Sequence, residues 1–241
     1  TVTFTLGGDD ASSFSISEAG VLSFVAAPNY EAQSSYSVTI TVSDGETTSS
    51  SELTIAVSNV NEGPTITSAS TAEVAENTTA VETLTSTDPD GDALSYALSG
   101  DDAGVFDLDT SNLALIFKAA PDFETPIDAD ENNTYLVTLT VADGNGGTVV
   151  QDLTITVTDV NEAPLITSEA ALSAAENQTA IGVITASDAE GATVTFTLGG
   201  DDAASFSISE AGVLTFAAAP NFESKATYAV TVSVGDGANT T

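Results

Sequence analysis

The feature that most constrains the fold is a long internal repeat. Residues 1–24, "TVTFTLGGDDASSFSISEAGVLSF", return almost unchanged at 193–216 as "TVTFTLGGDDAASFSISEAGVLTF". A looser copy, "ALSYALSGDDAGVFDLDTSNLALIF", occupies 93–117. Self-similarity at a long period is the signature of tandem units that each fold in the same way. We therefore expect a chain of similar domains rather than one large core.

Two nearly identical linker segments, called crossings below, mark where the units meet. "VNEGP" at 60–64 returns as "VNEAP" at 160–164. These crossings predict one complete unit at 65–164, preceded by 1–64, which lacks its first two strands, and followed by 165–241, which lacks its last. The incomplete units indicate a window cut from a longer array. Strand addition between neighbouring chains is the alternative explanation.

The complete unit has the pattern of an all-β domain. Apolar and β-branched residues alternate in short runs, and Gly and Asp turns such as "DPDGD" and "DGNGG" separate them. No stretch shows a helical apolar period. The expected strands lie near 65–75, 81–86, 94–98, 105–109, 113–118, 134–142 and 148–158. Seven short strands in roughly 100 residues predict tandem seven-stranded, immunoglobulin-like Greek-key β-sandwiches placed end to end.

The excess of acidic residues limits the classes of partner that the chain can bind. The chain carries 36 acidic residues against two lysines and no histidine, a formal net charge of -34. Such a surface repels nucleic acids and anionic lipids, and no apolar run is long enough to span a membrane. Cysteine is absent, so disulfides do not brace these domains. Ca²⁺ is the expected substitute, because it prefers the hard carboxylate oxygens that this chain supplies.

Acids recur at five loop positions in each unit. They are the "AEN" segment, "DPD" or "DAE", the "PDFE" family of loops, an Asp-Gly turn, and the crossing itself. In extended backbone, residues i and i+2 point to the same side, so "DPD", "DFE" and "DVN" each aim two oxygen-bearing side chains at one point. Solvated turn formation by Asp and Asn is the alternative explanation for these acids.

This ordered set of motifs resembles the cadherin repeat, in the form of the bacterial cadherin-like repeats of large secreted adhesins. "AEN" matches the Pro-Glu-Asn motif of that family, "DFE" its Asp-Arg-Glu, and "DVNEAP" its Asp-x-Asn-Asp-Asn-x-Pro linker. "DPD" matches its Asp-x-Asp, and the Asp-Gly turn its late Asp. The resemblance covers all three units. It implies that acids from two consecutive repeats together chelate up to three Ca²⁺ ions.

The resemblance assigns the ligands residue by residue. The junction between the second and third units is expected to use Glu76, Asp122, Glu124, Asp159, Asn161, Glu162, Asp188, Glu190 and Asp236, with a carbonyl at Asp201. The first junction is expected to use Asn29, Glu31, Asn59, Asn61, Glu62, Asp88, Asp90 and Asp143, with Asp101. Two of these residues, Asn29 and Asn59, stand where the family has acids, so two ions rather than three are expected at the first junction.

Other signals are weaker. "DADENN" at 128–133 echoes the start of an EF-hand loop, but Asn133 and Leu139 stand where that loop needs Gly and Glu. We expect a solvated loop there, with an extra weak cation site as the alternative. Paired carboxylates serve glycosidases only when one stays protonated in a partly apolar cleft, whereas these acids sit in polar repeated turns. We therefore expect no enzymatic activity.

The combined expectation is a calcium-rigidified extracellular stalk or adhesion array, part of a bacterial surface adhesin or filament. Its partners would be calcium, further repeats of the same polypeptide, and other copies of itself or a cell-surface or polysaccharide ligand. A calcium-dependent carbohydrate-binding module is the alternative. The absence of Trp disfavours it, because aromatic rings are the usual platforms for sugar rings.

Overall fold

The computed structural model describes residues 1–241. The chain divides into two compact parts. From here on these two parts are called the first and second unit, and the three segments expected from the sequence are called repeats. The first unit comprises residues 1–72, 81–116 and 136–154, and the second comprises 73–80, 117–135 and 155–241. The division passes through the second predicted repeat and therefore does not test the three boundaries expected from the sequence. The ranges 1–64, 65–164 and 165–241 stay predictions.

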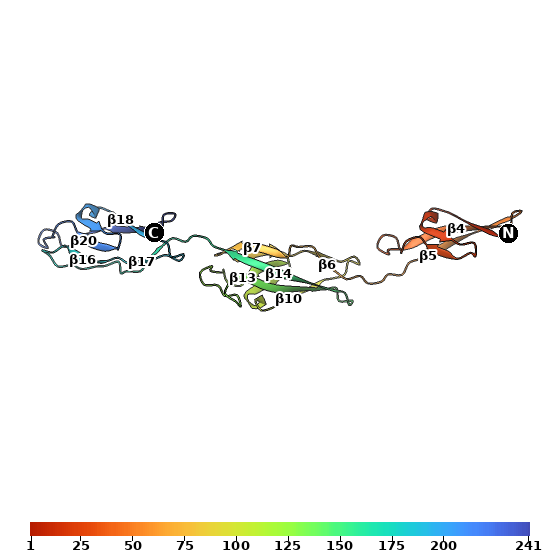
Figure 1. Cartoon of the computed structure of the whole chain (residues 1–241), viewed down its shortest axis with the longest axis horizontal. Helices are drawn as coiled ribbons and strands as arrows, with labels where there is room; N and C mark the ends of the chain where they lie inside the picture. Colours follow the sequence, from red (N-terminus) through yellow and green to blue (C-terminus); the bar gives the residue numbers. More distant parts are fainter. The chain divides into compact units, whose positions relative to one another are not determined.

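The first repeat, in the orange and red part of Figure 1, consists of two small sheets. Strands β1 (Thr3–Gly7), β4 (Ser35–Ser43) and β5 (Thr48–Ala56) form one sheet, and β2 (Phe14–Ile16) pairs with β3 (Leu22–Phe24) in the other. Tyr36 and Val38 alternate with exposed or half-buried neighbours along β4, so one face of that strand is buried with Phe14.

The second repeat has the longest strands. Its larger sheet has the order β10 (Ser95–Ser99), β13 (Thr134–Ala142), β14 (Thr148–Thr158) and β7 (Thr71–Ala75). The smaller sheet has the order β11 (Phe106–Asp109), β12 (Ala114–Phe117) and β8 (Ala80–Thr83). Every second residue of β13 is buried, from Tyr135 to Val141, as the alternating sequence predicts.

Two expected strands of this repeat are each split in two. The strand predicted at 65–75 consists of β6 (Thr65–Ile66) and β7, and the strand predicted at 81–86 consists of β8 and β9 (Ser86–Thr87). The cause is a change of partner, because β6 pairs with β9 in a sheet of its own while β7 joins β14. Sequence alternation does not record such a switch between sheets.

The third repeat follows the same plan. Strand β15 (Leu165–Ile166) pairs with β17 (Ala186–Ser187), β18 (Thr195–Gly199) pairs with β21 (Thr231–Gly235), and β16 (Ala180–Val183), β20 (Val213–Phe216) and β19 (Phe206–Ile208) form a sheet in that order. The final strand of this repeat is short, because β21 begins only at Thr231, although the alternating pattern "ATYAVTVSV" starts at Ala226. The predicted all-β fold of tandem β-sandwiches is confirmed.

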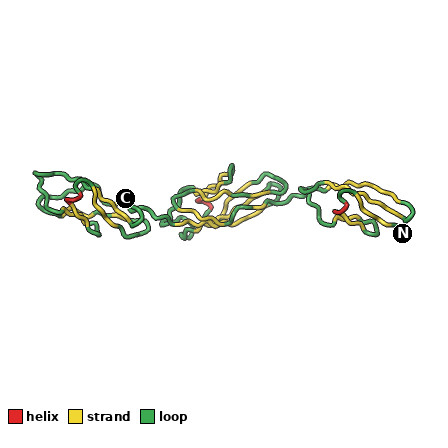
Figure 2. The backbone as a smooth tube through the Cα atoms, turned by 90° about the horizontal axis from the view of Figure 1, so that it is seen from above, coloured by secondary structure: helices red, strands yellow, loops and turns green.

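Each repeat also contains one short 3-10 helix directly after its "GDD" segment. These are η1 (Ala11–Ser13), η2 (Ala103–Val105) and η3 (Ala203–Ser205), drawn in red in Figure 2. No helix has the length and apolar character needed to cross a bilayer.

Candidate metal centres

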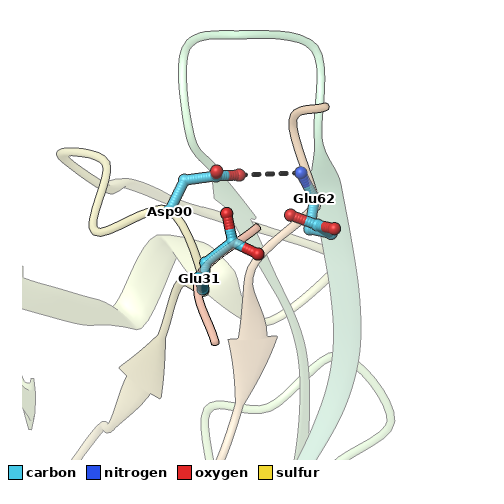
Figure 3. A group of neighbouring side chains, drawn as sticks. All are labelled: Glu31, Glu62 and Asp90. Atoms are coloured by element: carbon cyan, nitrogen blue, oxygen red, sulfur yellow. Dashed lines mark hydrogen bonds between the residues drawn. The ribbon is translucent and has the colours of Figure 1, made fainter. Parts of the chain in front are cut away.

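Three acids from the first unit converge where the crossing at 60–64 meets the "DPDGD" turn (Figure 3). One carboxylate oxygen from each of Glu31, Glu62 and Asp90 lies within 4.8 Å of the others. The crossing is also tied to Asp90 directly. Glu62 N donates to Asp90 Oδ2 at 2.8 Å, and Asn59 Nδ2 donates to Asp90 Oδ1 at 2.8 Å. The predicted ligands Glu31, Asn59, Glu62 and Asp90 are therefore brought together.

The "DPDGD" turn forms a second cluster on its own. Oxygens of Asp88, Asp90 and Asp92 lie within 4.8 Å of one another. The backbone N–H groups of Asp90 and Asp92 both donate to Asp88 Oδ1, whereas Asp88 Oδ2 is buried and receives no donor. Sequence reasoning missed Asp92, although a third acid two positions after Asp90 is a visible signal. The corresponding residue of the third repeat is Ala192.

The Asp-Gly turn of the second repeat also meets the first crossing. Asp143 is only 4% exposed and accepts a 2.8 Å hydrogen bond from Asn61 Nδ2. A Cβ added to Gly147 would lie 2.6 Å from Gly63 Cα and 2.1 Å from Asp143 Oδ2. Glycine is therefore required at position 147, because the crossing packs directly against this turn.

In the second unit, Glu76 anchors the equivalent arrangement. It is 2% exposed, and its two oxygens accept the N–H groups of Val160 and Phe123, each at 2.8 Å. Oxygens of Glu76, Glu124 and Asp159 lie within 4.8 Å of one another. A buried glutamate thus fixes both the crossing and the "PDFE" loop while staying next to two further carboxylates.

A second trio in this unit shares Glu124. Oxygens of Glu124, Glu162 and Glu190 lie within 4.8 Å of one another, and Glu162 N donates to Glu190 Oε1 at 3.1 Å. Buried oxygens of Glu162, Glu190 and Asp188 receive no donor. A cleft of about 340 Å³ is lined by Glu76, Asn77, Asp122, Glu124, Thr125, Glu162 and Ala189.

The crowding of carboxylates shifts their acidity. A hydrogen bond that protonated Glu162 donates to Glu190, followed by desolvation, raises the pKa of Glu162 to about 7, while the same contact lowers the pKa of Glu190. Desolvation and neighbouring acids raise the pKa of Glu62 and of Glu124. By contrast, the N–H of Glu62 lowers the pKa of Asp90. These glutamates are destabilised as anions, so a cation placed among them would gain electrostatic energy.

Other predicted residues have different contacts. Asn161 Nδ2 donates to Asp236 Oδ2 at 2.7 Å, which repeats the contact between Asn61 and Asp143. Asp101 and Asp201 are exposed.

The residue after the proline of each "PDFE"-type loop caps its own turn. The side-chain oxygen of Asn29 accepts the N–H of Ala32 at 2.6 Å, and that of Asp122 accepts the N–H of Thr125 at 2.8 Å. Asn29 and Asp122 therefore hold their own loops, and neither belongs to an acid trio.

The "DADENN" loop does not match the expected solvated loop at its first residue. Asp128 is only 4% exposed, and its carboxylate accepts the N–H groups of Asn132 and Asn133 at 2.8 and 3.1 Å. Asp128 therefore holds its own loop closed through these two hydrogen bonds. This is a structural role that its EF-hand-like spacing did not reveal.

The two sites fit a hard divalent cation. Their donors are carboxylate and amide oxygens, with no nitrogen or sulfur ligand available, and several buried oxygens have no hydrogen-bond donor. Calcium favours six to eight such oxygens in flexible geometry. If Ca²⁺ occupied these sites, Glu31, Glu62, Asp88 and Asp90 would hold it in the first unit, and Glu76, Glu124, Asp159, Glu162 and Glu190 in the second.

Comparison with known proteins places the chain in a family. The bacterial Ig domain profile matches residues 61–156 and 161–241. Human CDH23 EC21-23 matches in structure with a TM-score of 0.63 at 18% identity, covering 99% of this chain and 84% of that one. A protocadherin gammaB7 EC3-6 structure matches with a TM-score of 0.58 at 23% identity, covering 97% of this chain and 62% of that one.

A curated protein also matches in sequence. Chitinase A of Pseudoalteromonas piscicida is 36% identical over 77 residues, which is 31% of this chain and 9% of that protein. The chain therefore spans less than a tenth of the length of the curated relative that it matches. The predicted resemblance to a bacterial cadherin-like repeat is confirmed by the family match and by the structural neighbours.

Proposed function

The chain belongs to the bacterial Ig domain family, and from this premise we propose that it is a calcium-stiffened segment of an extracellular adhesion array. In this proposal, residues 1–64, 65–164 and 165–241 are successive repeats, and Ca²⁺ bridges the crossing of each repeat to the turns of the next. The array would be the stalk of a bacterial surface adhesin or filament. Ig-like and cadherin-like domain families are generally non-enzymatic, which agrees with a structural role.

One observation carries the proposal. In both units, the acids that converge come from segments far apart in the sequence: the loop after the fifth strand, the crossing, and the "DPD" or "DAE" turn of the following repeat. Glu31, Glu62 and Asp90 show this in the first unit, and Glu124, Glu162 and Glu190 in the second. Solvated turn formers have no reason to converge in this way, because like charges at such distances repel.

The ion would act by changing the sign of the interaction across the crossing. Without a cation, carboxylates from consecutive repeats repel one another and favour a bent or mobile crossing. A divalent ion neutralises them and binds both repeats at once, so a hinge becomes a fixed connection. Extracellular calcium modules bind at about 10⁻⁴–10⁻³ M, which is the affinity range we expect.

The test is a calcium titration by calorimetry, combined with small-angle scattering in millimolar Ca²⁺ and in chelator. We expect saturable binding and a narrower distribution of interatomic distances in calcium. If the scattering profile is the same in both buffers, the stiffening mechanism is wrong. If no calcium binds at millimolar concentration, the metal assignment fails as a whole.

The match to part of a chitinase makes a polysaccharide-binding role the competing proposal. Retention of the chain on insoluble chitin, measured with and without chelator, separates the two. The stalk function predicts no retention in either condition. Calcium-dependent retention would favour the carbohydrate-binding alternative instead.

A further inference from the structure

The glutamate supplied by the first repeat lies inside a small, well-defined turn. Over residues 29–33, Gln33 N donates to Asn29 O at 3.0 Å, and the Asn29 side chain accepts the N–H of Ala32 at 2.6 Å. Glu31 sits at the middle of this turn and is exposed. Its direction therefore depends on how firmly the whole turn is attached to the sandwich.

A carboxylate outside the acid cluster makes that attachment. Gln33 Nε2 donates to Asp10 Oδ1 at 2.9 Å, and Ser37 N donates to Asp10 Oδ2 at 2.7 Å. Asp10 is the second Asp of the "GDD" segment and directly precedes η1. One side chain thus joins the end of the turn that carries Glu31 to the beginning of β4.

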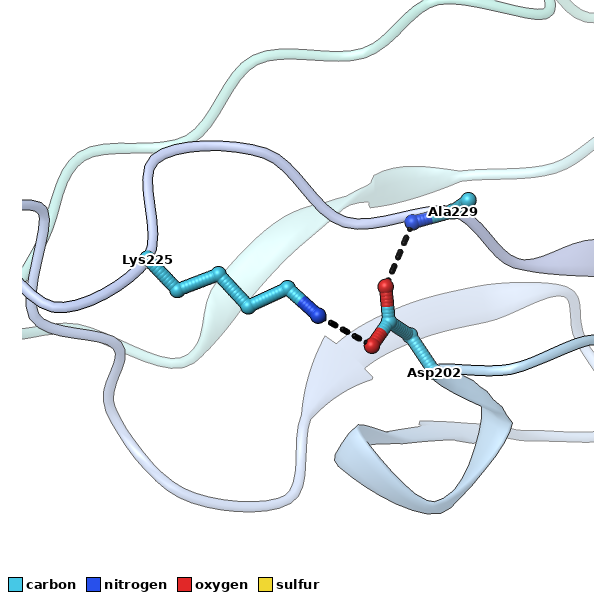
Figure 4. Close-up of polar contacts among 3 residues, drawn as sticks. All are labelled: Asp202, Lys225 and Ala229. Atoms are coloured by element: carbon cyan, nitrogen blue, oxygen red, sulfur yellow. Dashed lines mark hydrogen bonds and ion pairs between the residues drawn. The ribbon is translucent and has the colours of Figure 1, made fainter.

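The third repeat has the same arrangement with a different donor (Figure 4). Lys225 forms an ion pair with Asp202, and Ala229 N donates to Asp202 Oδ2 at 2.8 Å. Lys225 N also donates to Asn221 O at 3.0 Å, so the turn is closed as in the first repeat. The residue two places after the loop glutamate therefore reaches back to the second Asp of "GDD" in both repeats.

The second repeat attaches its turn differently. Leu136 N still donates to Asp102 Oδ2 at 2.7 Å, so the second Asp of "GDD" keeps its backbone bond. The fifth place of the turn is Pro126, which has no N–H and no polar side chain. Instead, Asn133 Nδ2, at the end of the "DADENN" loop, donates to Phe123 O at 2.8 Å. In each of the three repeats, a side-chain contact therefore holds this turn to another part of the repeat, and different residues make it. We call this contact the tether.

We propose that Asp10 and Gln33 are positioning residues for the cation at the first junction. The inference rests on the proposed function, because it assumes that Glu31 is a ligand. A tethered turn holds Glu31 close to Glu62 and Asp90 before the ion arrives, so less conformational entropy is lost on binding. Removing the tether keeps every ligand residue in the chain but lets Glu31 move, which weakens binding without changing the charge of the site.

The experiment uses terbium as a probe for calcium, with Tyr30 as the sensitiser. Tyr30 directly precedes Glu31, and the equivalent residues are Phe123 and Phe222. Terbium emission excited through tyrosine therefore reports the first junction, and Tyr30→Phe should remove most of that signal. Calcium affinity is then measured by displacement of terbium. The same measurement in a Tyr30→Phe, Phe123→Tyr chain reports the second junction.

Gln33→Leu is the informative variant, since it removes the tether, together with the 2.9 Å bond from Gln33 Nε2 to Ser35 O, and leaves the bond between Asp10 and Ser37 intact. We expect calcium affinity at the first junction to fall about fivefold, which corresponds to the ~1 kcal/mol that a typical hydrogen bond contributes, and affinity at the second junction to stay unchanged. Gln33→Lys, which copies the donor of the third repeat, should restore the affinity to within about twofold.

Lys225→Leu is the matched control, because it removes the same tether in a repeat whose loop glutamate, Glu223, belongs to no acid trio in this chain. It should lower the melting temperature without altering either affinity. Unchanged affinity in Gln33→Leu, in a wild type that does bind calcium, would overturn the positioning role alone. A similar loss from Lys225→Leu would also overturn it. Absence of any terbium signal displaceable by calcium in the wild type would instead refute the proposed function.

Discussion

The two acid sites differ most at one equivalent position in their crossings. In the first unit Asn59 donates to Asp90, so part of the charge on that acid is met by an amide hydrogen bond. In the second unit Asp159 has no such proton to give and instead lies with Glu76 and Glu124. The first site is thus partly closed by the protein itself. The second accumulates more negative charge, which a bound cation would neutralise.

This comparison separates two ways of holding consecutive repeats together. Amide contacts from Asn59, Asn61 and Asn161 to acids of the following repeat need no ion, so we expect them to persist in chelator. Convergent carboxylates act as a connection only when a cation is present. We therefore expect the second site to bind calcium more tightly and to lose more order when calcium is removed.

The largest effect should come from Glu124, because it belongs to both trios of the second site. Glu124→Gln keeps the size of the side chain and removes its charge, so we expect calcium affinity at the second site to fall about 30- to 100-fold. Calorimetry with the first site as internal reference measures this. The exposed Glu210→Gln is a matched control for the loss of one charge, and an equal effect there would contradict the assignment.

Acidification should weaken the second site next most strongly. The pKa of Glu162 is raised from 4.5 to about 7, so its proton must leave before the carboxylate can bind a cation. Calcium affinity should therefore fall about tenfold between pH 8 and pH 6, and calcium binding at pH 6 should release close to one proton. Calorimetry in buffers of different ionisation enthalpy counts that proton, and a flat profile would sink the prediction.

The raised pKa of Glu162 also determines the direction in which the stability of the metal-free fold changes with pH. The stabilising contribution of neutral Glu162 is fully present below 4.5, the ordinary value, and is lost as pH rises toward about 7. Thermal stability in chelator should therefore decline over that window, whereas stability in calcium should rise with pH. Glu162→Gln removes both trends if the assignment is right.

Exchanging the two crossing residues should convert one site toward the other. Asn59→Asp adds a ligand and removes the donor to Asp90, so calcium affinity at the first site should rise about fivefold while order in chelator decreases. Asp159→Asn should do the reverse at the second site. Displacement of terbium gives the affinities, and amide exchange of the crossings gives the order. If calcium affinity changed in the same direction in both variants, the difference inferred between the two sites would be wrong.

The smallest effect concerns Asp92, the acid with no counterpart in the third repeat. Asp92→Ala should weaken calcium binding at the first site about twofold, because Asp92 lies at the edge of the "DPDGD" cluster and is partly solvated. Ala192→Asp should tighten the second site by a similar factor. A tenfold loss in Asp92→Ala would show that Asp92 is a principal ligand, and the ligand set would then need revision.

The sequence predicted the features that are local. Alternation located the strands at 134–142 and 148–158 to the residue, since one face of each is buried. It did not locate the breaks after β6 and β8, because these depend on which strand lies alongside. The recurrence of acids singled out Glu124 and Glu162 before their proximity was visible.

The positioning residues were not predictable in the same way. The family resemblance pointed to Asp101 and Asp201, the first Asp of each "GDD", for a backbone carbonyl. The side-chain contacts are made by the second Asp, in Asp10 and Asp202. Gln33 has no motif of its own, and its partner lies 23 residues earlier in the chain. Only the folded turn brings such a pair together.

The matching aromatic clusters of the first and third repeats bear on how the chain folds. Phe14 and Phe24 pack with ring centroids 4.5 Å apart, and Phe206 and Phe216 at 4.8 Å, in hairpins of nearly the same sequence. Strand β2 therefore finds almost as good a partner in β20 as in β3, and such exchange is a characteristic misassembly of tandem domains. The second repeat, whose hairpin diverges, separates the two during synthesis. Alternating similar and dissimilar neighbours lets each hairpin close on itself before its near-copy emerges.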